Sequence, residues 1–315
     1  MGKIAFVFPG QGSQAVGMGK ALADEHEEIR ELFETADRKL GFSLSELMFN
    51  GPEEKLTLTM NAQPAILAAS IAALRIFEKE GIQPDFVAGH SLGEYTALTA
   101  AKALAFEDAV YVVHKRGQFM EQAVPAGEGT MAAVLGMERS LLQEVTDEIT
   151  ASGDTVGLAN LNCSGQIVIS GTKNGVARAG ELAKEKGAKR VLPLNVSGPF
   201  HSSLMKPATN QLEKVLAEVE IKNCDTPLIA NVDAKAVVKA EEIREKLLQQ
   251  LYSPVLWEDS VEALIEAGVD TFIEIGPGKV LSGLVKKVNR KVTTYSVQDG
   301  ESIQETAKAL KEAAQ

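Results

Sequence analysis

The sequence has few cysteines, histidines and aromatic residues. Among 315 residues, cysteine occurs twice, as Cys163 and Cys224, histidine occurs four times, and aromatics make up 5%. Two distant cysteines form neither a C-x-x-C pair nor a disulfide framework. The scattered histidines lack metal-ligand spacings such as H-E-x-x-H. The composition therefore argues against zinc-ribbon, disulfide-scaffold and zinc-protease classes, and we expect no metal.

Positive charge and long apolar runs are also scarce. The net charge is -11 and the isoelectric point about 5.1, whereas a nucleic-acid-binding protein should show a broad basic surface. The first six residues lack the apolar stretch of a signal peptide, and no window approaches 18 apolar residues. We therefore expect no nucleic acid partner, no membrane segment and a cytoplasmic protein. No long exposed apolar stripe requires a partner subunit, so we expect a monomer.

Alternating strand and helix signals predict a parallel α/β sheet. An apolar run at residues 4–8 ends at Pro9-Gly10, as a buried strand does. Helical patterns follow at 19–40 and 63–80. A second short strand at 86–89 leads into a helix at 94–103, which is the order of a βα unit. Further strands are expected at 228–232 and 271–275, and further helices at 241–252 and 260–267.

A change of composition at residues 124–129 marks an insertion. The segment after it predicts strand, helix, two strands, helix and strand, the βαββαβ order of a ferredoxin-like fold. The expected ranges are 130–135, 140–151, 156–160, 166–170, 173–186 and 189–193. We therefore expect an α/β-hydrolase-like core with a parallel sheet, formed by 1–127 and 196–315, and an inserted ferredoxin-like subdomain at 128–195.

The segment Gly89-His90-Ser91-Leu92-Gly93 matches G-x-S-x-G between a predicted strand and a predicted helix. Such a turn exposes the serine at the carboxyl edge of the sheet, and flanking glycines let it pack without Cβ clashes. The helix N-terminus offers N–H groups to a developing oxyanion. The pattern alone is common by chance, so an ordinary turn stays open, but its context favours Ser91 as a nucleophile.

A serine nucleophile needs a base, and the four histidines can be compared. His26 lies in a charged run, His90 adjoins Ser91 and should point away from the hydroxyl, and His114 lies in mid-helix. His201 lies in a loop just after a strand, where sites are commonly built. Elimination therefore favours His201, with a packed or capping histidine as the alternative.

Arg116 lies on the apolar side of the helix expected at 107–122. The residues that share this side are Ala109, Val112, Val113, Phe119 and Met120. A buried guanidinium needs an anionic partner, because an unpaired buried charge is costly. Two interpretations remain: an internal salt bridge, which is the commoner, and a clamp on a substrate carboxylate.

The loop Gly10-Gln11-Gly12-Ser13-Gln14-Ala15 imitates the dinucleotide-binding pattern G-x-G-x-x-A. A helix follows, and no second strand ends in an acidic residue at the required place, which argues against that interpretation. A backbone N–H of this loop, from Gln11, is a better candidate to face an oxyanion.

Taken together, these motifs resemble the malonyl-CoA:acyl carrier protein transacylase family of bacterial fatty acid synthesis. The resemblance runs in order along essentially the whole chain, through Phe8-Pro9-Gly10-Gln11-Gly12-Ser13-Gln14, Gln63-Pro64-Ala65, Gly89-His90-Ser91-Leu92-Gly93-Glu94, Arg116-Gly117, Phe200-His201 and Glu274-Ile275-Gly276-Pro277-Gly278. As a set they are far more specific than any one of them.

The resemblance implies a role for each site residue. Ser91 would carry the malonyl group as an ester and His201 would activate it, with the backbone carbonyl of Gln250 in place of a third acid. Backbone N–H groups of Gln11 and Leu92 would form the oxyanion hole. Arg116 would pair with the malonyl carboxylate. The remaining substrate-binding positions would be Gln63, which lines the pocket, and Phe200, which in related domains goes with malonyl.

The resemblance also implies the partners. Malonyl-CoA would be a substrate, so no separate cofactor is expected, and acyl carrier protein would accept the acyl group. Because carrier proteins of this family are acidic, a basic patch should dock them. Lys184, Lys186, Lys189 and Arg190 form one candidate, and Lys286 with Lys287 forms a second cluster. A merely solvated face is the alternative, and a serine esterase, a thioesterase, a polyketide-pathway acyltransferase and a non-catalytic scaffold are the competing functions.

Overall fold

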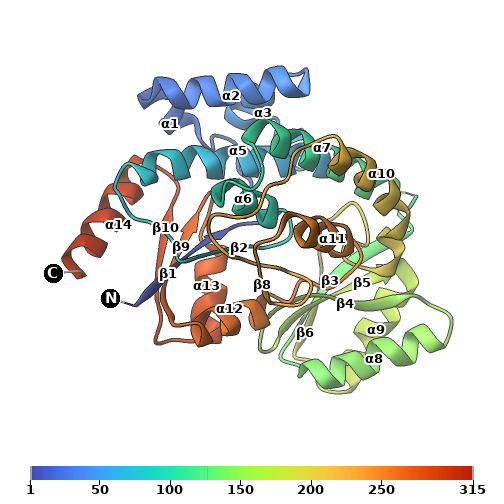
Figure 1. Ribbon diagram of the computed structural model, residues 1–315. Coiled ribbons are helices and arrows are strands. Elements are labelled where there is room, and N and C mark those ends of the chain that lie inside the picture. Colours follow the sequence, from blue (N-terminus) through green and yellow to red (C-terminus); the bar gives the residue numbers. More distant parts are fainter. Residues whose placement is uncertain (1, 126, 314–315) are drawn as a thin grey trace.

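The structure is a computed structural model that describes residues 2–125 and 127–313, and within them it contains two sheets with their covering helices (Figure 1). The large sheet has the order β10-β9-β1-β2-β7-β8. Its strands are β1 Lys3–Phe8, β2 Phe86–Gly89, β7 Leu228–Ile229, β8 Ala236–Val237, β9 Val269–Ile275 and β10 Thr293–Val297. All neighbours pair in parallel except β7 and β8. The expected parallel α/β core is therefore confirmed.

Alternate residues of β1 enter two different cores, as the two-residue period of a strand requires. Phe6 and Phe8 face a core shared with α2 Glu27–Leu40, α5 Thr59–Glu78 and α7 Phe106–Gln122. Ala5 and Val7 face the opposite core, which α12 Trp257–Glu266 and α13 Val280–Val288 cover. Figure 1 shows these helices on the two sides of the sheet. The large subdomain therefore has three layers, with the carboxyl ends of its strands free to carry a site.

The small sheet has the order β4-β5-β3-β6, with every pair antiparallel. Its elements are β3 Gly129–Leu135, α8 Arg139–Ala151, β4 Val156–Cys163, β5 Gln166–Thr172, α9 Lys173–Glu185 and β6 Arg190–Pro193. Both helices pack on one face of this sheet, in a core of their own. This topology is ferredoxin-like, as the sequence predicted. The opposite face of the small sheet turns toward the large subdomain.

Several predicted boundaries differ from the structure. The single helix expected at 19–40 is two, α1 Lys20–Glu25 and α2, because His26 between them has an extended backbone. The strand expected at 228–232 stops at Ile229, because Asn231 turns toward the loop after β2. The remaining elements are α3 Leu44–Asn50, α4 Glu53–Leu56, α6 Gly93–Ala100, a 3₁₀ turn Ser203–Met205, α10 Lys206–Ala217, α11 Ala240–Gln250 and α14 Gly300–Ala313.

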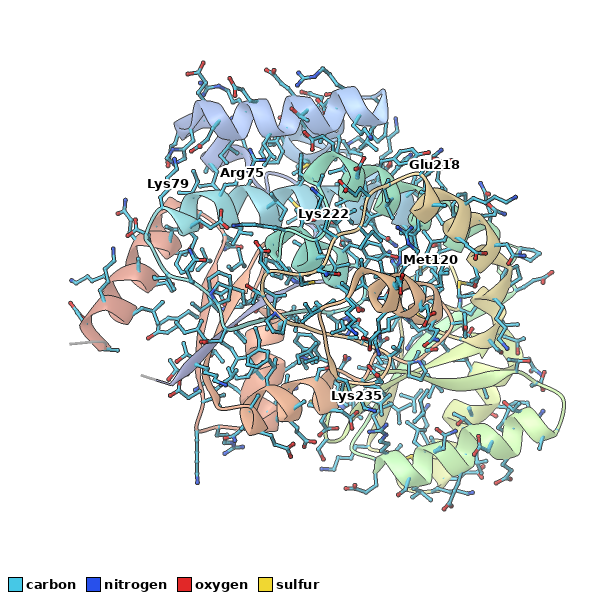
Figure 2. All side chains as sticks on the ribbon, in the orientation of Figure 1. Arg75, Lys79, Met120, Glu218, Lys222 and Lys235 are labelled. Carbon is cyan, nitrogen blue, oxygen red and sulfur yellow. The ribbon has the colours of Figure 1, made fainter. Side chains whose placement is uncertain are left out.

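Helix α5 corrects the expectation that no segment is apolar enough to cross a membrane. By length and composition it is, with a mean hydropathy of 1.3, but 83% of that window is buried inside the protein. It is enclosed on several sides, which is typical of a core helix. By contrast, many of the side chains that project from the outside of the fold end in nitrogen or oxygen (Figure 2).

Candidate active site

Ser91 lies in the sharp turn between β2 and α6, at the carboxyl edge of the large sheet. Its φ is 53°, in the left-handed region that side chains rarely adopt. Glycine is required at positions 89 and 93, on either side of Ser91, because neighbouring backbone atoms occupy the space that a Cβ would need. A Cβ on Gly89 would lie 1.9 Å from the Gly93 backbone, and one on Gly93 would lie 2.1 Å from the Phe8 carbonyl oxygen. The G-x-S-x-G pattern therefore presents the Ser91 side chain at the edge of the sheet.

The structure brings Ser91 and His201 together from positions 110 residues apart. Ser91 Oγ lies 2.7 Å from His201 Nε2, and His201 Nδ1 lies 2.8 Å from the backbone carbonyl oxygen of Gln250. A carbonyl oxygen only accepts, so Nδ1 carries the proton and Nε2 is free to accept the hydroxyl proton. Burial, followed by the charge of Arg116, lowers the pKa of His201 to about 3. The imidazole is therefore neutral at pH 7 and can act as a base.

Arg116 is fully buried at the bottom of the same pocket. Its Nη1 donates to Gln63 Oε1 at 2.7 Å, and its Nη2 donates to Gln250 Oε1 at 2.8 Å and to Ser91 Oγ at 3.2 Å. Its Nε has no partner among the described residues. All these acceptors are neutral, and within 2–125 and 127–313 no carboxylate lies within 4.0 Å of the guanidinium. The internal salt bridge considered above is therefore absent from the described part of the chain.

Close packing of α5 on α7 explains how Gln63 reaches Arg116. Gly117 has no side chain, and a Cβ there would lie 2.6 Å from the Cα of Met60. Pro64 cannot donate a backbone hydrogen bond to the carbonyl of Met60, four residues earlier. The ring of His114 contacts that carbonyl instead, with Nδ1 2.7 Å from the oxygen. His114 therefore makes a structural contact. By bonding to the Met60 carbonyl it connects α7 to α5 and helps to hold the two helices at the distance that brings Gln63 to Arg116.

Gln11 and Leu92 line the pocket on the side of Ser91. Neither backbone N–H has a hydrogen-bond acceptor in the ranges that the structure describes. The Gln11 side chain is fixed separately, since its Nε2 donates to Thr59 Oγ1 at 3.1 Å. Two free N–H groups beside a nucleophilic hydroxyl can stabilise a negatively charged oxygen.

Apolar side chains close the pocket around these polar groups. Phe200 is 5% exposed, and it lines the pocket with Met120, Met131, Leu194 and Val196. Met120, on the last turn of α7, lies inside the fold near the small subdomain (Figure 2). Both subdomains therefore contribute to the site, which holds a nucleophile, a base, two free N–H donors and a buried cation.

The sequence matches the family described as "acyl transferase domain" over residues 5–310. The chain belongs to this acyl transferase family. The match spans both subdomains, so the small subdomain is part of the family architecture.

Relatives of this acyl transferase are similar over nearly their full length. It is 60% identical to a malonyl CoA-acyl carrier protein transacylase of Bacillus subtilis (strain 168), covering 99% of this chain and 98% of that one. Among solved structures, an acyl carrier protein S-malonyltransferase of Vibrio cholerae is 46% identical with a TM-score of 0.94, covering 96% and 99%. A malonyl-transacylase solved with its type II polyketide acyl-carrier protein is 42% identical with a TM-score of 0.94, covering 98% and 99%.

The acyl transferase site contains residues that sequence reasoning did not single out. Asn231 accepts from the Ser91 N–H at 2.7 Å and donates to the Gly89 carbonyl at 2.7 Å, so it spans the nucleophile turn. Asn162 lies 2.8 Å from the ring of His90 and holds that histidine away from the Ser91 hydroxyl. Glu94, 1% exposed, contacts the side chain of Gln250. Of these three residues, only Glu94 could be noticed in the sequence, because it belongs to the motif that contains Ser91. Asn162 and Asn231 come from segments distant from that motif in sequence.

The predicted basic residues of the acyl transferase do not form one patch. All four are exposed, but Lys184 lies on the helix-covered face of the small sheet, beside Val191. Lys186 pairs with Glu148 at 3.0 Å. Lys189 and Arg190 lie at the start of β6, where Arg190 pairs with Leu135. The cluster therefore divides into two surfaces.

Proposed function

We propose that this acyl transferase moves the malonyl group of malonyl-CoA to the phosphopantetheine thiol of acyl carrier protein, through an ester on Ser91. The observation that carries the proposal is the buried Arg116 beside a serine–histidine pair, with only neutral acceptors among its described partners. A substrate carboxylate supplies the missing negative charge. The relatives named above support the same reaction.

In the first half-reaction, Ser91 Oγ attacks the thioester carbonyl while His201 Nε2 takes its proton. The negative charge that develops on the carbonyl oxygen faces the N–H groups of Gln11 and Leu92. The C–S bond then breaks, the proton on His201 passes to the coenzyme A sulfur, and malonyl-Ser91 remains. Arg116 holds the malonyl carboxylate throughout.

In the second half-reaction, the carrier thiol enters the same position and gives its proton to His201. Its sulfur attacks the malonyl-Ser91 ester, and Ser91 leaves with that proton. Because both halves use one set of groups, the reaction is a ping-pong exchange of thiols. The Arg116 contact also disfavours acetyl, which would leave the guanidinium without an anion.

Product analysis tests this function against a hydrolase. With malonyl-CoA and a holo acyl carrier protein, we expect malonyl-carrier to accumulate in near-equal amount to released coenzyme A. A serine esterase or thioesterase would instead release free malonate, detected by mass spectrometry. Free malonate as the main product, with carrier present, would overturn the proposal.

The pathway and setting are part of the proposal. Fatty acid synthesis is favoured by the 60% identity to the Bacillus subtilis transacylase. A polyketide pathway is the second candidate, because a 42% identical relative was solved with a type II polyketide carrier. We further propose that the enzyme acts in the cytoplasm as a monomer, without a nucleic acid partner, a metal or a separate cofactor.

We propose that Lys189 and Arg190 dock the carrier together with Lys287. Leu135 lies between Arg190 and Gln166 in the small sheet, and Lys287 Nζ donates to Gln166 Oε1 at 2.8 Å. These cations therefore share one end of the sheet. Asn162, which contacts His90, lies on a strand three spacings away from Arg190, which is about 14 Å. This span suits the phosphopantetheine arm of a carrier protein that is bound at Lys189, Arg190 and Lys287 and whose thiol enters the pocket.

Charge reversal of this surface should weaken carrier binding. In the double variant Lys189→Glu, Arg190→Glu, we expect KM for the carrier to rise about tenfold at low salt, because rim charges steer association. The effect should shrink as salt increases. The matched control is Lys308→Glu on α14, a 78% exposed lysine distant from the small sheet, which should leave KM unchanged. An unchanged KM in the double variant would contradict the docking surface.

A further inference from the structure

Gln250 connects the groups of the active site through three of its atoms. Its backbone oxygen holds His201, and its Oε1 accepts from Arg116 at 2.8 Å. Its Nε2 donates to the backbone oxygen of Ser91 at 2.8 Å. The same Nε2 lies 2.6 Å from Glu94 Oε2. The orientation of one side-chain amide therefore determines whether an acceptor or a donor faces the guanidinium.

Glu94 fixes that orientation together with the Ser91 carbonyl and the Arg116 guanidinium, and it is the charged acceptor of the three. An amide has nearly the same shape in its two orientations, so its neighbours decide which end carries the oxygen. A carboxylate oxygen accepts hydrogen bonds, and it therefore selects the NH₂ end of Gln250. The flipped amide would place NH₂ against the Nη2 of Arg116, where two donors face each other without an acceptor. Glu94 is thus the one carboxylate tied to this hydrogen-bond network among the described residues.

The contact between Glu94 and Gln250 lies in a buried position, where an ionised carboxyl group is unfavourable. Glu94 lies in the first turn of α6 and is 1% exposed, and its other polar contact is the Asn231 N–H at 3.4 Å. Burial raises the pKa of Glu94 to about 7, although Gln250, Asn231, Arg116 and Lys246 act in the opposite direction. Placing a carboxyl group there is unfavourable unless its contacts compensate. At pH 8 most of the carboxyl is ionised.

We propose that Glu94 is a positioning residue that helps to fix the Gln250 amide, and through it the guanidinium of Arg116, and so strengthens the preference for acyl groups that end in a carboxylate. The proposal rests on the malonyl transfer proposed above. It assigns Glu94 no contact with the substrate. Acetyl does not use the Arg116 contact, so its transfer depends less on Glu94.

The test compares acylation of Ser91 by malonyl-CoA and by acetyl-CoA at pH 8. In Glu94→Leu, which removes the charged acceptor of Gln250 Nε2 and leaves only the Ser91 carbonyl, we expect the malonyl-to-acetyl ratio of kcat/KM to fall at least tenfold. Glu94→Gln keeps one acceptor oxygen and should restore part of the ratio. The matched control is Glu274→Gln, since Glu274 is also fully buried but accepts from the N–H groups of Leu281 and Ser282 on α13. This control should leave the ratio within about twofold.

Charge alone predicts the opposite result. Removing a negative charge near Arg116 makes the site more positive, which would favour malonyl. An increased or unchanged ratio in both Glu94 variants would therefore overturn the positioning role. If Glu94→Leu does not fold, the smaller variant Glu94→Ala, which also removes the carboxylate, decides by the same ratio. Failure of the proposed function is distinguishable, because the unmodified enzyme would then release free malonate in place of malonyl-carrier or form no malonyl adduct.

Discussion

The variant Ser91→Ala loses the malonyl adduct that the unmodified enzyme acquires on mixing with malonyl-CoA. We expect the rate of coenzyme A release to fall at least about 1,000-fold, because the free N–H groups of Gln11 and Leu92 retain only a small part of the catalysis. Intact-protein mass spectrometry measures the adduct directly. The expected adduct on the unmodified enzyme is one malonyl group.

His201→Ala and one serine control complete that experiment. His201→Ala should slow acylation by a similar factor, since Ser91 then lacks its proton acceptor. Ser197 contacts Thr59, with 3.0 Å between the two hydroxyl oxygens. Ser197→Ala should still form the adduct. A malonyl adduct that persists in Ser91→Ala would place the ester on another residue and reject this assignment.

The nucleophile turn could be predicted because its determinants are local in sequence. Gly89 and Gly93 are required by contacts under 2.2 Å that a Cβ would make, and the strand and helix beside them have clear patterns. The βαββαβ order of the small sheet was predictable for the same reason. The two-residue strand β8 was not, because so short a strand leaves no pattern to detect, and the apolar run that predicted β7 extends beyond the two residues that pair.

The partners of the site residues could be predicted only in part. The apolar helix face showed that Arg116 is buried, but periodicity could not show what it contacts. Gln63 and Gln250 lie 53 and 134 positions away in sequence. Asn231 reaches Ser91 across 140 positions, by a turn that replaces the strand expected there. Such contacts follow from the sheet order, which a single sequence does not specify.

The basic cluster shows the same limit for surface charge. Four cations close in sequence predicted one patch, yet strand alternation places Arg190 and the helix-facing Val191 on opposite faces. The second cluster, from a helix about 100 positions later, joins Arg190 through Gln166 instead. Charge pattern along the chain therefore gave the residues, and the sheet register determined which of them share a surface.

Arg116 is a buried cation with no carboxylate within 4.0 Å among the described residues. Its neighbours supply oxygen acceptors from Gln63, Gln250 and Ser91, all neutral, and its own Nε is unpartnered among the described residues. Burial lowers the pKa of Arg116 below its ordinary value, although the charges of Tyr95 and Glu94 act in the opposite direction, so the charge of Arg116 is only partly compensated. A malonyl carboxylate provides that compensation and an acetyl group does not.

Arg116→Ala should therefore reverse the selectivity of the enzyme. We expect acylation by malonyl-CoA to fall about 100-fold or more, the effect of losing a charged contact worth about 3 kcal/mol. Acylation by acetyl-CoA should hold or rise, because no guanidinium is left unpaired. Arg116→Lys is the matched control: it keeps the charge but loses the fork geometry, and should lie between the two. Quench-flow rates on both thioesters measure this, and equal losses for malonyl and acetyl would assign Arg116 to holding the fold.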